Sequence, residues 1–261
     1  DYVLTPEFTI SNFIKIDYPI TKVEFNPGES VVISGKAIKE SGQPVTGFLD
    51  FYLINDVTNI SVTDTVSGGY FSINFSLPKN IPAGKYLAKI KVYEKEENGE
   101  ITNSGFVDYN IVVIQVPANL EIVFEEKEVE PGTNLKIKAV LHDQSGEQIK
   151  STATITIKDA QGNILEQTEK STDEFLEYPI KYNEPPAEWS VSAISGNLSS
   201  ETTFKIKEKY AIKSELINQT LLVKNVGNMP YNDTLIVKIG DAIINLNITL
   251  GVDESEKYAL S

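Results

Sequence analysis

The sequence predicts an all-β protein of tandem sandwich domains in an elongated arrangement. Three observations lead to that class. Apolar residues recur at every second position, as in Leu49, Phe51 and Leu53, which is the period of a strand with one buried face. Turn-forming pairs such as Pro27-Gly28 return about every ten residues, a spacing typical of sandwiches. No stretch carries the i, i+3, i+4, i+7 spacing of a long helix.

An internal repeat sets the number of sandwiches. Pro27-Gly28 and Pro131-Gly132 lie 104 residues apart, and Ser41-Gly42 and Ser145-Gly146 lie at the same offset. Each pair of turns brackets an alternating segment, so the two copies are expected to share their strands. Trp189 lies near the end of the second copy, in register with an aromatic residue of the first. We therefore expect Trp189 to be a core residue.

The first repeat contains about seven candidate strands, which is the number and size of an immunoglobulin-like (Ig-like) sandwich. In chain order they are 22–25, 30–37, 46–55, 59–64, 69–76, 84–93 and 105–115. Residues 1–21 resemble the end of a preceding unit, with Phe8–Ile10 and Phe13–Ile16 as apolar stretches. We expect this segment to add an edge strand, and an exposed edge would be a docking surface.

The pattern changes from Lys209 onward, where no Pro-Gly turn opens the segment. Five short strands are predicted there, at 210–217, 220–226, 234–240, 243–250 and 256–260. The segment is either a small incomplete sandwich or a domain whose last strands follow Ser261 in the native polypeptide. The predicted organisation is 1–21 as an N-terminal strand or linker, 22–116 and 117–208 as Ig-like sandwiches, and 209–261 as the smaller third segment.

The composition excludes several classes of site. All 23 basic residues are Lys, His142 is the single histidine, and Cys is absent. Disulfides, thiolate metal sites and two-histidine metal sites are therefore impossible within this sequence. A net charge of -14 repels nucleic acid and anionic membrane surfaces. We expect neither an enzyme nor a cofactor, because no pattern pairs a nucleophile with a base.

Two parts of the chain resemble known modules. The first repeat, with Pro27–Val31, Gly42–Gly47 and Pro82–Tyr86, resembles the Ig-like and macroglobulin-type sandwiches of prokaryotic surface proteins. The third segment, with Leu222–Asn228 and Asn232–Thr234, is similar to the adhesion-related (CARDB-like) sandwiches of archaeal and bacterial exported proteins. The resemblance implies a secreted or cell-surface spacer or adhesion module of archaeal type. The thioester of true macroglobulins is impossible here without Cys.

Membrane attachment within the sequence is not expected. The longest aliphatic run, Ile111–Ile114, is far shorter than a membrane span. The sequence starts with Asp1 rather than Met, so we expect a processed chain or a fragment. Any signal peptide or membrane anchor would then lie outside these residues.

Six Asn-x-Ser/Thr acceptors for N-glycosylation are present, at Asn59, Asn74, Asn197, Asn218, Asn232 and Asn247. Strand alternation places the side chains of Asn74 and Asn247 on outer faces, where a glycan would fit. We therefore expect a glycoprotein in which at least one of these sites is modified.

An acidic run lies at the junction of the two repeats. Glu126, Glu128 and Glu130 are weak candidates for a Ca²⁺ site, because carboxylate oxygens are the ligands that Ca²⁺ prefers. Lys127 interrupts the run, and a solvated edge strand is the favoured interpretation. His142 stands at a strand end beside a turn, and we expect it to be a surface or edge histidine.

The sequence predicts a structural and adhesion module of a cell-surface protein. Its partners would be further copies of itself, forming a surface layer or filament through edge strands and faces, or other surface proteins, or glycans. The alternative is a carbohydrate-binding or accessory module of a larger exported enzyme. An exposed row of aromatic residues would favour that alternative, and Tyr52, Tyr70 and Tyr93 are the candidates.

Overall fold

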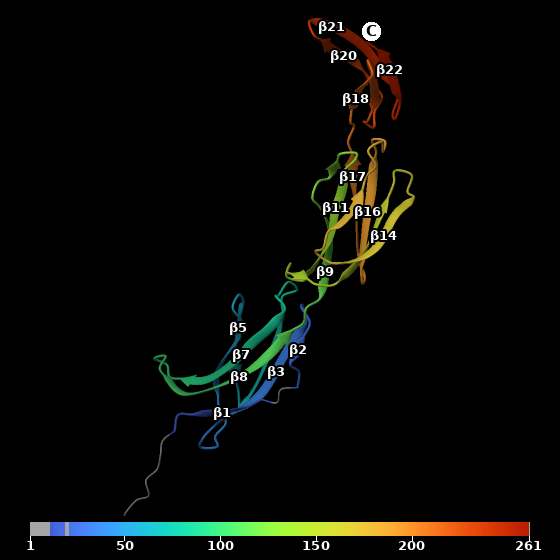
Figure 1. Ribbon diagram of the computed structural model, residues 1–261. Helices are drawn as coiled ribbons and strands as arrows, with labels where there is room; N and C mark the ends of the chain where they lie inside the picture. Colours follow the sequence, from blue (N-terminus) through green and yellow to red (C-terminus); the bar gives the residue numbers. More distant parts are fainter. Residues whose placement is uncertain (1–10, 19–20, 261) are drawn as a thin grey trace, which may run out of the picture. The chain divides into compact units, whose positions relative to one another are not determined.

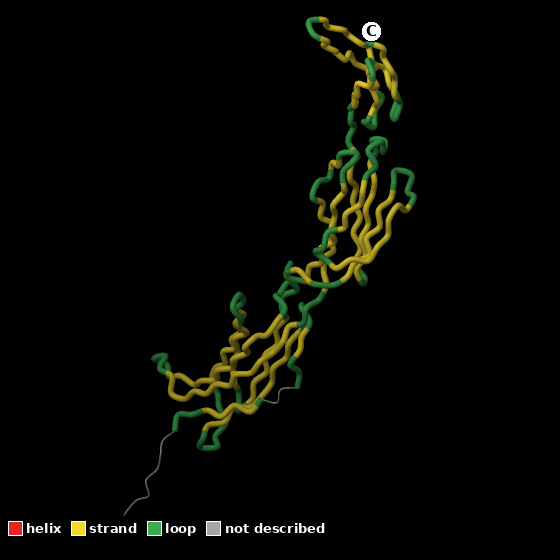
Figure 2. The backbone as a smooth tube through the Cα atoms, in the orientation of Figure 1, coloured by secondary structure: helices red, strands yellow, loops and turns green. Residues whose placement is uncertain are grey.

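The computed structural model describes residues 11–18 and 21–260. Every helix or strand element in these ranges is a β-strand, so the predicted all-β class is confirmed (Figures 1 and 2). No helix that could cross a membrane is present in the described ranges. The chain forms two compact units. The first contains the residues up to Ala118 together with Asp143–Glu147, and the second contains Asn119–His142 together with the residues from Gln148 on. The elongated arrangement remains a prediction.

Two antiparallel layers make up the first sandwich. One sheet has the order β1-β3-β6, with β1 (Ile14–Asp17), β3 (Ser30–Lys39) and β6 (Tyr70–Ser76). The other has the order β2-β8-β7-β4-β5, with β2 (Glu24–Phe25), β8 (Ile101–Val113), β7 (Gly84–Lys95), β4 (Gly47–Ile54) and β5 (Asn59–Val66). All pairs are antiparallel except β2 with β8. This division of strands between two sheets is that of an Ig-like sandwich.

The core of the first sandwich follows from strand alternation. Leu49, Phe51 and Leu53 of β4 are at most 1% exposed, and they face the other sheet while the residues between them face outward. Tyr86, at the start of β7, is also buried, and its hydroxyl donates a hydrogen bond to the Pro82 carbonyl oxygen at 2.9 Å. That bond is the tyrosine corner typical of Ig-like domains, and it satisfies the one polar atom of a buried ring.

The predicted N-terminal edge strand is confirmed. β1 pairs antiparallel with β3, with Ile14 opposite Lys39. β1 also passes over Gly105 of β8, where an added Cβ would lie 1.9 Å from the Ile14 carbonyl oxygen. Glycine is therefore required at position 105. The apolar stretch Phe8–Ile10 lies outside the described residues.

The second sandwich repeats the strand order of the first. One sheet contains β12 (Gln148–Ile149), β11 (Asn134–Asp143) and β15 (Leu176–Pro179), with β9 (Pro117–Phe124) also paired to β11. The other has the order β10-β17-β16-β13-β14, with β10 (Glu128–Val129), β17 (Leu198–Ile206), β16 (Glu188–Ser195), β13 (Thr152–Lys158) and β14 (Ile164–Ser171). Trp189 occupies the place of Tyr86 and is 4% exposed, so its predicted role as a core aromatic is confirmed.

The third segment has the five predicted strands and a small core. β18 (Ile212–Ile217), β19 (Thr220–Asn225) and β22 (Ser255–Ala259) form one sheet, and β20 (Tyr231–Ile239) and β21 (Ala242–Leu250) form a hairpin. Four apolar residues are buried between them: Leu221, Val223, Ile248 and Leu250. The segment shares one compact unit with the second sandwich.

Two asparagines explain the Asn-Val-Gly-Asn stretch of the third segment. Asn225 is fully buried, and its amide nitrogen donates to the carbonyl oxygens of Met229 and Gly251 at 2.9 and 3.1 Å. The amide nitrogen of Asn228 donates to the carbonyl oxygens of Glu184 and Lys207, each at 2.8 Å. These buried amides satisfy backbone groups that would otherwise lack partners, so they fix the start of the third segment.

Candidate binding face

The outer surface of the large sheet of the first sandwich is the most distinctive surface of the described chain. Cross-strand pairing brings residues of β4, β7 and β8 together on this side. We define the aromatic face as Phe48, Asp50, Tyr52, Lys89, Lys91, Tyr93, Lys95, Ser104, Phe106 and Asp108.

Two rings and two lysines of the aromatic face contact each other. Phe48 and Tyr93 are directly opposite each other, and their rings stack with centroids 5.6 Å apart and planes 26° apart. The Lys95 Nζ lies 4.3 Å from the Phe48 ring centroid, and the Lys91 Nζ lies 5.3 Å from that of Tyr93. These are cation–π distances. The two lysine ammonium groups are therefore held beside the rings.

Phe106 is the most exposed ring of the aromatic face. It stands directly opposite Lys91 and is 73% exposed. In the neighbouring row Lys89 stands opposite Asp108, and the Lys89 Nζ lies 3.9 Å from the Asp108 Oδ2. Phe106 therefore leaves a large apolar ring in water on the outer face of β8, where it contributes nothing to the core.

The electrostatics of the aromatic face keep Tyr93 protonated. Burial raises the pKa of the Tyr93 hydroxyl, and the neighbouring Asp50 and Tyr52 raise it further. Tyr93 is therefore a neutral hydrogen-bonding group throughout the physiological pH range. The charged groups of the face are three lysines and two aspartates.

The second sandwich carries a different surface in the same place. The outward positions of β13, β16 and β17 are mainly small hydroxyl residues, with one exposed Ile194: Thr152, Thr154, Thr156, Ser190, Ser192, Ser199 and Thr203. The row Asp50, Lys91 and Phe106 thus corresponds to Thr154, Ile194 and Ser199.

The sequence predicted two of the four rings of the aromatic face. Tyr52 and Tyr93 lie on it together, whereas Tyr70 is exposed on the opposite sheet with the Lys36 Nζ 5.3 Å from its ring centroid. Phe48 and Phe106 were not predicted. The outward phase of β4 was available as a signal for Phe48. Phe106 lies within the predicted strand 105–115, but its place opposite Lys91 depends on the register between β7 and β8.

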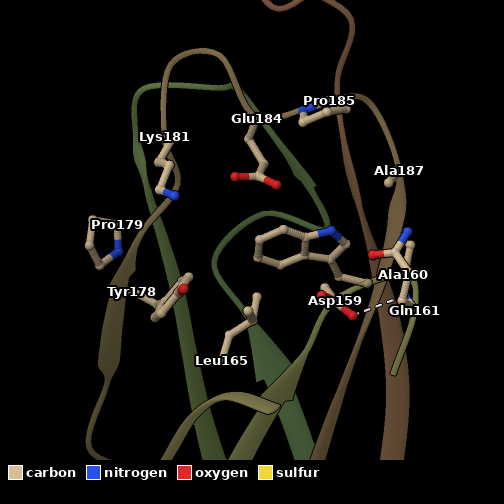
Figure 3. Close-up of a pocket in the computed structure, with 11 residues that line it drawn as sticks. Asp159, Ala160, Gln161, Leu165, Tyr178, Pro179, Lys181, Glu184, Pro185 and Ala187 are labelled. Carbon is tan, nitrogen blue, oxygen red and sulfur yellow. Dashed lines mark hydrogen bonds between the residues drawn. The ribbon is translucent and has the colours of Figure 1, made fainter. Parts of the chain in front are cut away.

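A small pocket lies at one end of the second sandwich (Figure 3). Its volume is about 210 Å³, and its walls include Asp159, Leu165, Lys181 and Glu184. Figure 3 shows Lys181 and Glu184 at one end and Leu165 at the other. The lining residues include no Ser, Thr or His, and the Asp159 carboxylate is engaged by its own turn.

The six predicted glycosylation asparagines are all exposed, namely Asn59, Asn74, Asn197, Asn218, Asn232 and Asn247. Asn74 lies on the outer face of β6 opposite Val32, as alternation predicted. Asn247 faces outward on β21, where its Oδ1 accepts a hydrogen bond from the Thr234 hydroxyl at 3.1 Å. Their modification remains a prediction.

The acidic run at the start of the second sandwich does not come together as a cation site. In the described ranges no three Asp, Glu or His side chains are grouped so as to hold a metal ion, so Glu126, Glu128 and Glu130 do not form such a group. Glu128 pairs through its backbone in β10 with Lys205 of β17. His142 is half-buried at the end of β11, with its Nε2 3.6 Å from the Glu121 Oε2.

No family model and no curated protein matches this chain. Solved structures superpose on it at low identity. Salmonella alpha-2-macroglobulin reacted with methylamine is 12% identical with a TM-score of 0.32, covering 98% of this chain and 21% of its own. The Yersinia pseudotuberculosis adhesin InvE is 14% identical with a TM-score of 0.33, covering 89% and 66%. The amphioxus IgVJ-C2 molecule is 15% identical with a TM-score of 0.31, covering 70% and 99%.

The chain spans about a fifth of the macroglobulin to which it is similar. All three TM-scores lie well below the value of a shared overall fold. The Ig-like type is therefore assigned from the strand order and the tyrosine corner.

Proposed function

We propose that this chain is an extracellular structural and adhesion module of a prokaryotic surface protein, and that the aromatic face is its adhesive surface. The observation that carries the proposal is the internal comparison between the two sandwiches. They share a strand order, yet only the first exposes Phe48, Tyr93 and Phe106 on its large sheet. Because the second sandwich folds with hydroxyl residues there, the rings are not needed for folding. Binding is the remaining use for them.

The wider proposal follows the composition and the architecture. The protein acts without catalysis or a cofactor, and the third segment serves as a CARDB-like adhesion-related module of an archaeal-type surface protein. Self-assembly into a surface layer or filament would use β5 and β14, which stand at one end of each five-stranded sheet. An edge strand offers unpaired N–H and C=O groups to a second chain. Exposed acceptors such as Asn74 would carry glycans on the other sheet.

The adhesive role of the aromatic face is tested by binding of the purified full chain to envelope fragments of the source organism. We expect Phe48→Thr with Phe106→Ser, which install the residues of the second sandwich, to abolish binding. The matched control is Val32→Ser with Tyr70→Ser on the opposite sheet, and it should bind like the unchanged protein. Equal binding by both double variants would remove the aromatic face from the proposal.

A further inference from the structure

We propose that the aromatic face binds an acidic glycan, a short stretch of pyranose sugars that carry carboxylates. Phe106 is the stacking ring, and Lys91 and Lys95 are the carboxylate partners. The inference rests on the proposed adhesive role of this face and names the chemical class of its ligand. Three observations carry it: the exposed ring, the placement of the lysines, and the size of the patch.

The exposed ring suits the apolar side of a sugar. The face of an aromatic ring is electron-rich and attracts polarised C–H groups, which a pyranose ring presents on one side. Phe106 is 73% exposed, so one sugar can lie on it without displacing a neighbour. Of the other three rings, Phe48 and Tyr93 are occupied with each other, since they stack. They form a wall beside Phe106 rather than a second platform.

The lysines select for negative charge. Lys91 stands directly opposite Phe106, and side chains in that relation have Cβ atoms about 5 Å apart. An ammonium group is therefore within reach of a carboxylate on a sugar that lies on the ring. Lys95 is anchored over Phe48 in the next row. The face carries three lysines against two aspartates, although the whole chain has a net charge of -14.

The size of the patch favours a short glycan over a protein. The patch spans three strands and three cross-strand rows, roughly 10 Å by 13 Å between Cα positions from the usual sheet spacings. A stable protein interface takes about 20–30 residues on each partner, whereas the aromatic face has ten. Two or three sugars match the patch.

The test is isothermal titration of the full chain with a panel of acidic oligosaccharides: trigalacturonate, trimannuronate and sialyllactose. Galactotriose is the neutral probe. We expect one or more acidic probes to bind with a Kd of about 1 mM or below, and at least tenfold more tightly than galactotriose. Binding should weaken as salt rises, because the lysines are near the surface.

Variants separate the ring from the charge. Phe106→Ser should weaken all binding about tenfold through loss of the stacking contact, whereas Lys91→Ile should reduce the preference for acidic over neutral probes, because only Lys95 remains as a carboxylate partner. Lys91→Arg keeps the charge and should restore that preference. Tyr70→Ser, on the opposite sheet, is the matched control and should bind unchanged.

Several results would overturn the inference: no binding by any acidic probe, equal affinity for galactotriose, or full affinity in Phe106→Ser. The envelope assay separates this failure from failure of the proposed function. If envelope binding is lost in Phe48→Thr with Phe106→Ser while no acidic probe binds, the face is adhesive toward another ligand, such as a protein. If neither assay depends on Phe106, both proposals fail.

Discussion

On the large sheet of the first sandwich, the outward residues of one row are Asp50, Lys91 and Phe106, and in the second sandwich they are Thr154, Ile194 and Ser199. The inward residues of the two sheets are mainly apolar, with Ser195 as a buried polar exception in the second. The two sandwiches therefore share their strand order and a mainly apolar core, whereas the outward residues of their large sheets differ.

The comparison separates folding from binding within a single chain. A sandwich of this type needs its alternating core and its turns. It also needs a buried aromatic residue near the start of one strand, which is Tyr86 in β7 and Trp189 in β16. It does not need aromatic rings on the outer face, since the second copy has none among the corresponding positions. The hairpin of β7 and β8 is also longer than that of β16 and β17, which gives the aromatic face its extra row.

The largest expected effect concerns Gly105, which lets β1 pass over β8. Its counterpart in the second sandwich is Leu198, so only the first sandwich requires glycine there. Gly105→Ala should lower the free energy of unfolding of the first sandwich by about 3 kcal/mol, since the new Cβ meets backbone. Urea unfolding by circular dichroism measures the loss. The neighbouring outward Ser104→Ala is the control.

Tryptophan fluorescence sharpens that measurement, because Trp189 is the single tryptophan and reports the second sandwich. Its unfolding midpoint should not move in Gly105→Ala, since Gly105 belongs to the other compact unit. A circular-dichroism midpoint equal to that of the unchanged chain would show that β1 does not pack as described.

A smaller effect is expected for the tyrosine corner. Tyr86→Phe removes the hydroxyl that donates to the Pro82 carbonyl oxygen and should cost about 1 kcal/mol of unfolding free energy. The second sandwich instead packs Trp189 edge-on against Phe204, with ring centroids 5.9 Å apart. Tyr52→Phe, on the aromatic face, should change stability by less than about 0.5 kcal/mol. Equal effects of the two variants would contradict the structural role of the corner.

Changes on the aromatic face should affect binding far more than stability. Phe48→Thr gives up the stack with Tyr93 and the contact with Lys95, which together are worth about 1 kcal/mol or less at an exposed site. The circular-dichroism spectrum should be unchanged while envelope binding falls. Unfolding of the first sandwich by Phe48→Thr would show that the ring serves the fold.

The smallest effect is a pH dependence confined to one turn. Asp159 accepts hydrogen bonds from the Asn163 side chain and from the backbone N–H groups of Asn163 and Gln161, and these bonds lower its pKa, the Asn163 side chain most. The stability contributed by the ionised carboxylate is therefore complete above its unfolded value of about 3.9 and is lost as the pH falls through the lower folded value.

The corresponding turn of the first sandwich cannot titrate in this way. There the Asn55 Oδ1 accepts hydrogen bonds from the backbone N–H groups of Val57 and Thr58 at 3.0 and 2.7 Å, and an amide has no carboxyl proton to gain. We expect the amide chemical shifts of Gln161 and Asn163 to titrate below the ordinary carboxyl range, and Asp159→Asn to abolish that titration. A midpoint at or above the ordinary value would contradict the hydrogen bonding of this turn.

Most of the fold could be predicted from the sequence because strand alternation and turn residues are local signals. The strands at 47–54 and 70–76 fall within about a residue of their predicted ranges. The candidate site was only partly predictable, since it depends on which residues stand opposite each other across strands. Tyr52 and Tyr93 were identified, whereas Phe106 joins them only through the hairpin register. The acidic run illustrates the reverse, because only Glu128 of its three candidates lies on a strand, β10, while Glu126 and Glu130 lie outside it.

The most direct test of the central claim transfers the aromatic face from one sandwich to the other. Phe48→Thr, Lys91→Ile and Phe106→Ser remove it from the first, and Thr152→Phe, Ile194→Lys and Ser199→Phe install its key residues on the second. Envelope binding is measured for the chain with the first set and for the chain with both. We predict loss of binding with the first set and recovery with both. Undiminished binding with the first set would contradict the assignment of adhesion to this face.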